Sequence, residues 1–217
     1  AAEMAEYGPR FYEAGATIVG GCCCTTPDYI NKIARCIKGK APVARTFTPG
    51  LRITSRMKTV LIGPGHPFCI IGEKINPTGR KKFAGAIAEG RMDLVVAEAR
   101  RQFEAGATAL DVNVGVPLTD EPALMGKAIT AIQNVVDLPL VIDSSYIEAL
   151  KQGLINYPGK ALVNSINAES ERIEMIFPLV KKYGAAVIAL CAEDEIPERA
   201  ADRIKNSPLE EVLVTNT

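Results

Sequence analysis

The stretch Leu110-Asp111-Val112-Asn113-Val114-Gly115 carries an apolar run into polar side chains at the point where the run ends. Apolar runs of this kind predict buried strands. They lie near residues 60–62 or 69–71, then at 109–112, 138–142, 161–163 and 186–190. Amphipathic stretches between them predict helices at residues 93–104, 121–135, 147–156 and 170–183. Strands separated by single helices predict parallel βαβ units.

Polar side chains stand at the carboxyl end of each predicted strand. They are Glu73 and Asn76, Asp111 and Asn113, Asp143, Ser144 and Ser145, Asn164, Ser165 and Asn167, and Glu193 and Asp194. A (β/α)8 barrel builds its active site from the carboxyl ends of all its strands, whereas an open doubly wound sheet uses one switch point. We therefore predict an α/β fold of the (β/α)8 TIM-barrel type. Because only about five to six βα units fit after residue 59, the barrel is expected to be incomplete.

A short phrase recurs at residues 12–17, 103–108 and, more loosely, 182–186. Each copy ends a helical stretch at a glycine suited to the left-handed position after a helix, and an apolar run follows. The first copy therefore predicts a strand just before Gly20. Proline and glycine are dense over residues 38–67, which suits a linker. We predict one segment at 1–39, a linker at 40–58 and a second domain at 59–217.

The composition excludes several classes of protein. Lys and Arg total 25 and Asp and Glu total 25, so the basic surface needed for sequence-independent nucleic-acid binding is not expected. The longest apolar runs, such as residues 185–191, are too short to span a bilayer. The start has neither an initiator Met nor a secretory signal, which suggests a piece of a longer protein. Three consecutive cysteines in a chain that is not loop-rich indicate a reducing, cytoplasmic compartment.

The cysteines stand in the segment Gly20-Gly21-Cys22-Cys23-Cys24-Thr25-Thr26-Pro27. Two neighbouring thiolates after a tight glycine turn can reach one Zn²⁺, which would lower the pKa of a substrate thiol. A further ligand has to come from elsewhere. The alternative is that these cysteines are small buried hydrophobic residues.

This segment resembles the last strand of the homocysteine S-methyltransferase domain. The resemblance implies that Cys22 and Cys23 are zinc ligands and that residues 1–39 form the final βα unit of another barrel. The third cysteine of that family comes from an earlier strand that this sequence does not contain, and Cys24 stands where the family usually has glycine.

Four further segments occur in order: 71–79, 110–115, 141–145 and 163–167. Together they resemble the pterin-binding domain shared by cobalamin-dependent methionine synthases, corrinoid methyltransferases and, more distantly, dihydropteroate synthases. The resemblance implies that Asp143 and Asn164 contact the pterin. It also places four residues around the same mouth: Glu73, Asn76, Asp111 and Asn113.

The implied activity is methyl transfer from 5-methyltetrahydrofolate through cob(I)alamin toward homocysteine. The implied partner is a corrinoid domain or corrinoid protein. The family's later aspartate and its asparagine near N5 have no counterpart here, so no catalytic residue is assigned and activity of this chain alone is not expected.

Other interpretations of the same residues remain open. Asp143 and Asn164 are residue types that commonly cap helices, and Asp111 and Glu73 could pair with Lys74 or Arg80. The chain could also be a non-catalytic module that binds pterin or a corrinoid partner. A dihydropteroate synthase-like condensation is a further alternative, which the Gly-Gly-Cys-Cys segment disfavours.

Overall fold

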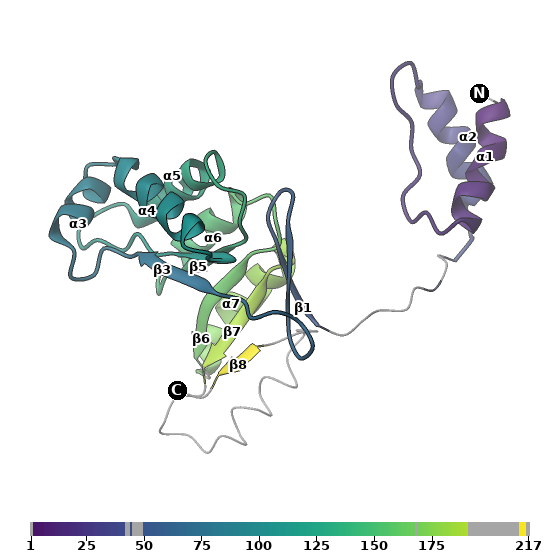
Figure 1. Ribbon diagram of the computed structural model, residues 1–217. Coiled ribbons are helices and arrows are strands. Elements are labelled where there is room, and N and C mark those ends of the chain that lie inside the picture. The colour runs from purple at the N-terminus through teal and green to yellow at the C-terminus, as the bar shows by residue number, and fades with distance from the viewer. Residues whose placement is uncertain (1, 42–43, 45–49, 168, 191–212, 216–217) are drawn as a thin grey trace. The chain divides into compact units, whose positions relative to one another are not determined.

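The computed structural model describes residues 2–41, 44, 50–167, 169–190 and 213–215. The chain divides into two compact units, Ala1–Pro49 and Gly50–Thr217 (Figure 1). The division falls inside the stretch predicted to be a linker. Among the described residues, no helix combines the length and apolar character that crossing a membrane requires.

The second unit is built on a six-stranded parallel sheet whose strands follow one another in chain order. The strands are β3 (Ile71–Ile75), β4 (Ala109–Val112), β5 (Leu140–Asp143), β6 (Leu162–Asn167), β7 (Ala186–Leu190) and β8 (Leu213–Thr215). Each strand pairs in parallel with the next. This is the strand order of a barrel wall, so the predicted α/β barrel-type fold is confirmed, with the barrel incomplete.

Helices connect the strands. They are α3 (Lys81–Ala88) and α4 (Asp93–Glu104), then α5 (Glu121–Gln133), α6 (Ile147–Ile155) and α7 (Ser170–Tyr183). Four of them match the predicted helices to within two residues, and α3 is an addition. The predicted turns before the strands are present, since Gly106 and Gly184 have φ of 93° and 63°. Only residues without a β-carbon enter that region freely, which is why the helices end there.

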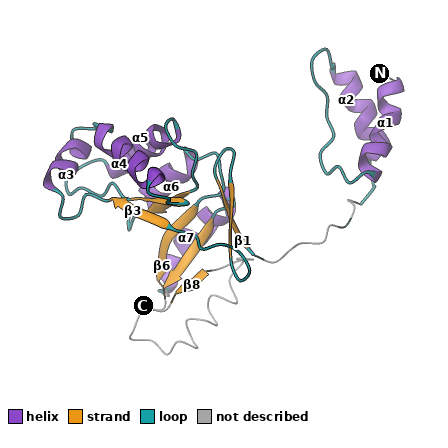
Figure 2. Cartoon of the chain, in the orientation of Figure 1, coloured by secondary structure: helices purple, strands orange, loops and turns teal. Residues whose placement is uncertain are grey.

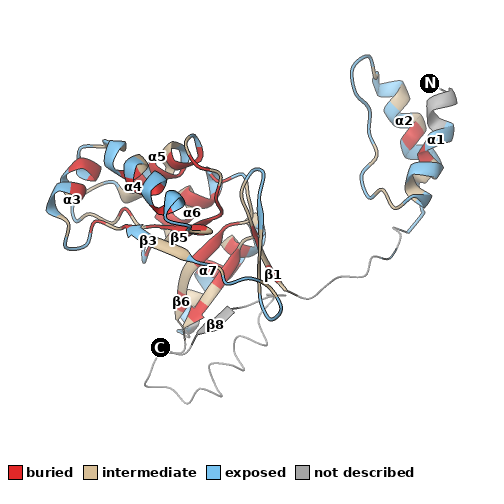
Figure 3. Ribbon diagram, viewed as in Figure 1, coloured by how far each residue is buried: buried red, intermediate tan, exposed pale blue. Residues whose placement is uncertain are grey.

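The sheet has two buried faces because successive strand residues point to opposite sides. Leu110, Val112 and Ile142 belong to the larger cluster, which packs against the helices. Ala109, Val141 and Leu162 belong to a smaller cluster on the concave face. Figure 3 shows the buried residues gathered along the strands and on the sides of the helices that face them.

A β-hairpin covers the amino end of the concave face. Strand β1 (Leu51–Thr54) pairs antiparallel with β2 (Thr59–Ile62), and Ile53 is fully buried in the smaller cluster. The Thr54 N–H donates to the Lys160 carbonyl at 2.9 Å. The Tyr157 hydroxyl donates to the Thr54 carbonyl at 2.8 Å and accepts from the Leu140 N–H at 3.1 Å. The hairpin is thus tied to the loop before β6 and to the start of β5.

Two sequence predictions differ from the structure. Strand β1 lies inside the predicted linker, because the alternating Leu51 and Ile53 find apolar partners on the concave face. The strand predicted before Gly20 does not form. Ile18 is 91% exposed, and the first unit consists of α1 (Ala2–Glu13) and α2 (Pro27–Ile37) with no strand among its described residues (Figure 2). A strand needs a neighbour to accept its backbone hydrogen bonds.

The contact between the hairpin and the β6 loop predicts a stability defect. A β-carbon on Gly159 would overlap the backbone carbonyl of Thr54. We therefore expect Gly159→Ala to displace the hairpin and lower the free energy of unfolding by about 2 kcal/mol or more. Chemical denaturation measures this. Gly85→Ala is the matched control, because a β-carbon there meets nothing within 4 Å and helical Gly→Ala changes are neutral or stabilising. Equal effects of the two changes would contradict the role given to the hairpin contact.

Candidate functional site

Side chains from three neighbouring strands meet above the apolar layer of the concave face. Asp111 on β4 follows the buried Ala109 on that face, Asp143 on β5 follows Val141, and Asn164 on β6 follows Leu162. Alternation along each strand therefore puts all three on the concave side, at the carboxyl ends of the strands. We call this group, with Glu73 and Asn113, the mouth.

Two carboxylate–carboxamide pairs tie the mouth together. The Asn164 Nδ2 donates to Asp111 Oδ1 at 3.1 Å, reaching across the intervening strand β5. The Asn113 Nδ2 donates to Asp143 Oδ2 at 2.9 Å, and its Oδ1 accepts from the Gly115 N–H at 2.9 Å. Each amide is thereby held in one orientation, so the side chains are fixed before any ligand arrives.

The mouth concentrates negative charge. Asp111 is only 3% exposed, and its burial, with Asp143 and Glu73 nearby, raises the pKa of its carboxyl to about 7 against the lowering effect of the Asn164 hydrogen bond. Burial also raises the pKa of Asp143, helped by Glu121 and Glu73 and opposed by the Asn113 hydrogen bond. The mouth therefore keeps a proton at a pH where an ordinary aspartate has lost it.

Glu121 is a member of this acidic group that sequence reasoning missed. It opens α5 directly after Asp120, whose Oδ1 caps the helix by accepting from the Ala123 N–H at 3.1 Å. The Ser144 hydroxyl donates to the Glu121 carboxylate, and Ser144 is itself buried. An acidic residue at a helix start is explained locally by the helix dipole, so its sequence position gives no signal of a role in a site.

The structure separates the six predicted pterin residues into groups. Asp111, Asn113, Asp143 and Asn164 come together in the mouth. Glu73 lies within β3 rather than after it, is exposed, and acts on both aspartates through its charge. Asn76 instead shapes the loop after β3, where its Oδ1 accepts from the Thr78 N–H at 2.9 Å.

The capping and ion-pair interpretations do not hold for these residues. The N-cap of α6 is Tyr146 and that of α7 is Glu169, so Asp143 and Asn164 cap neither helix. Among the described residues, no ion pair joins Glu73 or Asp111 to Lys74 or Arg80, and Arg80 pairs with Glu98 at 2.8 Å.

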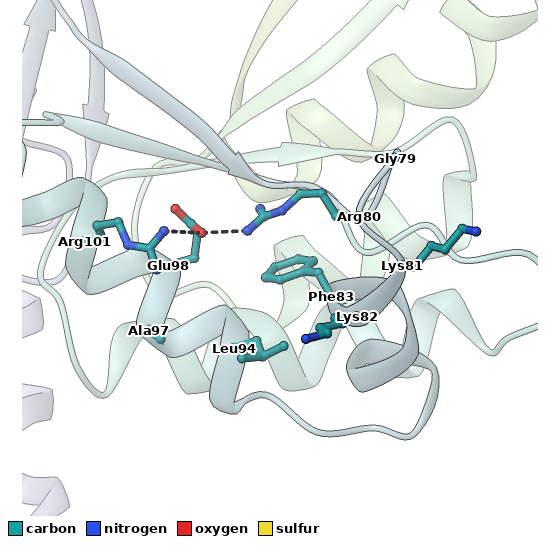
Figure 4. A pocket seen from close by; sticks show the side chains of 9 residues that line it. All are labelled: Gly79, Arg80, Lys81, Lys82, Phe83, Leu94, Ala97, Glu98 and Arg101. Carbon is teal, nitrogen blue, oxygen red and sulfur yellow. Dashed lines mark hydrogen bonds and ion pairs between the residues drawn. The ribbon is translucent and has the colours of Figure 1, made fainter.

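A cavity of about 480 Å³ lies apart from the mouth, between the loop after β3 and helix α4 (Figure 4). In it, Glu98 Oε2 accepts from Arg80 Nη2 at 2.8 Å and from Arg101 Nη1 at 3.4 Å. The Arg80 guanidinium also lies 4.4 Å from the centre of the Phe83 ring. The buried Glu98 charge is thus compensated within the fold, and no residue of the mouth lines this cavity.

Cys22 and Cys23 lie exposed in the first unit, with their sulfur atoms 3.7 Å apart. Hydrogen bonds with the Cys23 backbone and side chain lower the pKa of Cys22. A protein zinc site needs three or four ligands, and no group of three or more His, Cys, Asp or Glu side chains suited to a metal occurs among the described residues. Two thiols alone leave a tetrahedral zinc site incomplete.

Two known protein families match the chain, one in each of its two compact units. A family model described as pterin binding enzyme matches residues 72–215, which is more than half of the chain. A model described as homocysteine S-methyltransferase matches residues 1–37.

Two solved structures share the fold. The 7,8-dihydropteroate synthase from Vibrio fischeri ES114 superposes with a TM-score of 0.52 at 15% identity, over 76% of this chain and 65% of that one. The dihydropteroate synthase from Xanthomonas albilineans, in complex with indole-2-carboxylic acid and 6-chloroguanine, gives 0.52 at 16%, over 76% and 64%. The chain thus spans less than two thirds of their length, and at this identity the likeness concerns the fold alone.

The raised pKa of Asp111 predicts how stability depends on pH. Between the ordinary value of 3.8 and about 7, the unfolded chain has released this proton while the folded chain still holds it. Stability therefore falls as the pH rises through this window. Between about pH 5 and about pH 8 the wild-type chain should therefore lose free energy of unfolding. We expect Asp111→Asn, which can still accept the Asn164 hydrogen bond, to make this loss smaller by ~2 kcal/mol.

Urea denaturation at a series of pH values measures this difference. Asp93→Asn is the control, since Asp93 is exposed and pairs only loosely with Arg91 at 3.4 Å. A wild-type curve that rises with pH over the window, or an Asp111→Asn curve parallel to it, would contradict the prediction.

Proposed function

This chain belongs to the pterin binding enzyme family, and from that membership we propose that the mouth binds the pterin ring of 5-methyltetrahydrofolate for methyl transfer. The observation that carries the proposal is the pair of cross-strand contacts, Asn164 to Asp111 and Asn113 to Asp143. They hold carboxylates and carboxamides in fixed orientations at the carboxyl ends of neighbouring strands.

The chemistry of the mouth suits the edge of a pterin. That edge alternates N–H donors with carbonyl and ring-nitrogen acceptors, and carboxylates with carboxamides can match both kinds in two-point contacts. We assign direct contact with the ring to Asp143 and Asn164. Asp111 and Asn113 orient these two, and Glu73 lies at the rim; Asn76 acts on the site through the loop it shapes.

In methyl transfer from 5-methyltetrahydrofolate, N5 is the leaving group. It leaves more readily as a neutral amine than as an anion, so a proton donor near N5 favours the reaction. The mouth retains a proton near neutral pH, because burial raises the pKa of Asp111 to about 7. We propose that Asp111, which accepts a hydrogen bond from Asn164, holds this proton near the ring. A corrinoid on a partner domain or protein would supply the nucleophile that takes up the methyl group, and no described residue is assigned to hold it.

The match of residues 1–37 to homocysteine S-methyltransferase supports homocysteine as the final methyl acceptor in the protein to which this activity belongs. It favours a methionine synthase-like role over a dihydropteroate synthase-like condensation, since the likeness to the synthases concerns the fold. On this proposal, residues 1–39 are the end of a homocysteine S-methyltransferase domain and residues 59–217 are part of the pterin domain. The second candidate is a module that binds pterin without catalysis, and it rests on the same mouth.

Titration with 5-methyltetrahydrofolate tests the binding proposal. We expect Asp143→Ala and Asn164→Ala each to weaken binding by about 10- to 100-fold, because each leaves a ligand group without its partner. Isothermal calorimetry measures the affinity. Glu148→Gln serves as the control, since Glu148 is an exposed residue of α6 paired with Lys151. Wild-type affinity in both Asp143→Ala and Asn164→Ala would contradict the assignment of these residues to the pterin site.

Adding cob(I)alamin to the loaded chain separates the two candidates. Methylcobalamin formation, followed in the corrinoid absorption spectrum, supports methyl transfer. Pterin binding with an unchanged corrinoid spectrum supports the binding module.

Metal analysis tests the role that the family resemblance gives to Cys22 and Cys23. With two thiols in place, we expect weak zinc binding that a chelator removes readily and that Cys22→Ser abolishes. Cys36→Ser is the control, because Cys36 is an exposed cysteine of α2 outside the pair. Equal zinc content in both variants would contradict the assignment.

A further inference from the structure

Asn167, the last residue of β6, lies on the same side of the sheet as Asn164. Val163 pairs with Val187 and Ile166 with Ala189, so β6 uses one more residue than β7 over this stretch. Val163 and Ile166 both belong to the cluster that packs against the helices. The residue after each one therefore points to the concave face, which places Asn167 beyond Asn164 in the mouth.

The side-chain oxygen of Asn167 is buried without a hydrogen-bond partner. Within the described part of the chain, no group donates to Asn167 Oδ1. By contrast, Asn113 Oδ1 in the same mouth accepts from the Gly115 N–H. Buried acceptors are paired in nearly all native proteins, and an orphan at a concave polar surface is expected where a bound molecule completes the pairing.

The mouth has few protein donors to offer. The Nδ2 groups of Asn113 and Asn164 already donate to Asp143 and Asp111. Glu73 and Glu121 accept hydrogen bonds when ionised, and the Ser144 hydroxyl donates to Glu121. Among the described residues, none donates to Asn167 Oδ1 in the free chain, so an N–H of a ligand in the mouth can take that place.

We propose that Asn167 is a further pterin-binding residue, whose Oδ1 accepts a hydrogen bond from a ring or amino N–H of the bound pterin. This inference rests on the proposed function. A pterin suits the position because its edge carries several N–H donors, whereas a ligand with acceptors alone would leave Asn167 unpaired. Asn167 thereby selects for a donor-bearing ring, in addition to the contacts assigned to Asp143 and Asn164.

The proposal predicts opposite effects on stability and on binding. Asn167→Leu keeps the branched shape of the side chain and removes the buried orphan oxygen, so the free chain should keep or raise its melting temperature. The same change removes the acceptor for the ligand, so affinity for 5-methyltetrahydrofolate should fall about tenfold or more. A residue that only supports the fold would lose stability instead.

Asn164→Leu is the matched comparison, because it removes a donor that Asp111 uses in the free chain. We expect that variant to lose both stability and affinity. Asn167→Ala is a second test without added bulk, and it should also weaken binding. Thermal unfolding without ligand and calorimetry with 5-methyltetrahydrofolate supply the two readouts for all three variants.

Wild-type affinity in Asn167→Leu and Asn167→Ala, alongside weak binding in Asn164→Leu, would overturn this inference and leave the proposed function standing. A loss of stability in both Asn167 variants as large as that in Asn164→Leu would also overturn it, because the oxygen would then have a partner in the free chain. A wild-type chain that binds no pterin would remove the inference together with the proposed function.

Discussion

Each strand of the parallel sheet has to satisfy two environments at once, because its successive side chains point to opposite faces. One set packs against the helices, as Leu110 and Val112 do. The other set faces the concave side, where apolar residues occupy the amino-end layer and polar residues the carboxyl-end layer. This alternation brings Asp111, Asp143 and Asn164 together although they lie far apart in the sequence. The polar layer is thus a consequence of the same periodicity that builds the core.

The mouth is electrostatically unfavourable by itself. The charges of Asp143 and Glu73 make ionisation of Asp111 harder. Those of Glu121 and Glu73 do the same to Asp143. A fold selected for stability alone would place apolar residues on such a buried layer. The hydrogen bonds from Asn164 to Asp111 and from Asn113 to Asp143 reduce the cost of burying the carboxylates without removing it. Such a pattern is typical of residues kept for binding or chemistry.

Much of this architecture could be predicted from the sequence, and the exceptions have physical causes. Strands β4 and β7 and helices α4 and α7 lie where periodicity and the following glycines place them, because those signals are local. Strand β1 and its pairing with β2 could not be predicted, since the apolar residues of β1 are explained only by a face formed by distant strands. The strand expected before Gly20 failed for the converse reason: its sequence is strand-like, yet its described surroundings provide no partner.

At the site, the grouping of Asp111, Asn113, Asp143 and Asn164 could be predicted, whereas the part of Glu121 could not. Asn167 could be placed near the end of its strand but not on a face of the sheet. Glu121 reaches the mouth from a helix start where an acidic residue is unremarkable. Asn167 faces the mouth only because β6 contains an extra residue, and simple alternation from Asn164 would have turned it toward the helices. Irregular strand pairing cannot be predicted from one sequence.

The strict chain order of the sheet also sets the order in which the unit can assemble. Every strand from β3 to β8 pairs with the next one along the chain, so most of the sheet forms through contacts of short sequence separation, which favours rapid folding. The hairpin is the exception, because Thr54 binds Lys160 across 106 residues. Its loop can close only after β5 and the start of β6 exist. The amino end of the concave face is therefore covered only after the strands beneath the hairpin have come together.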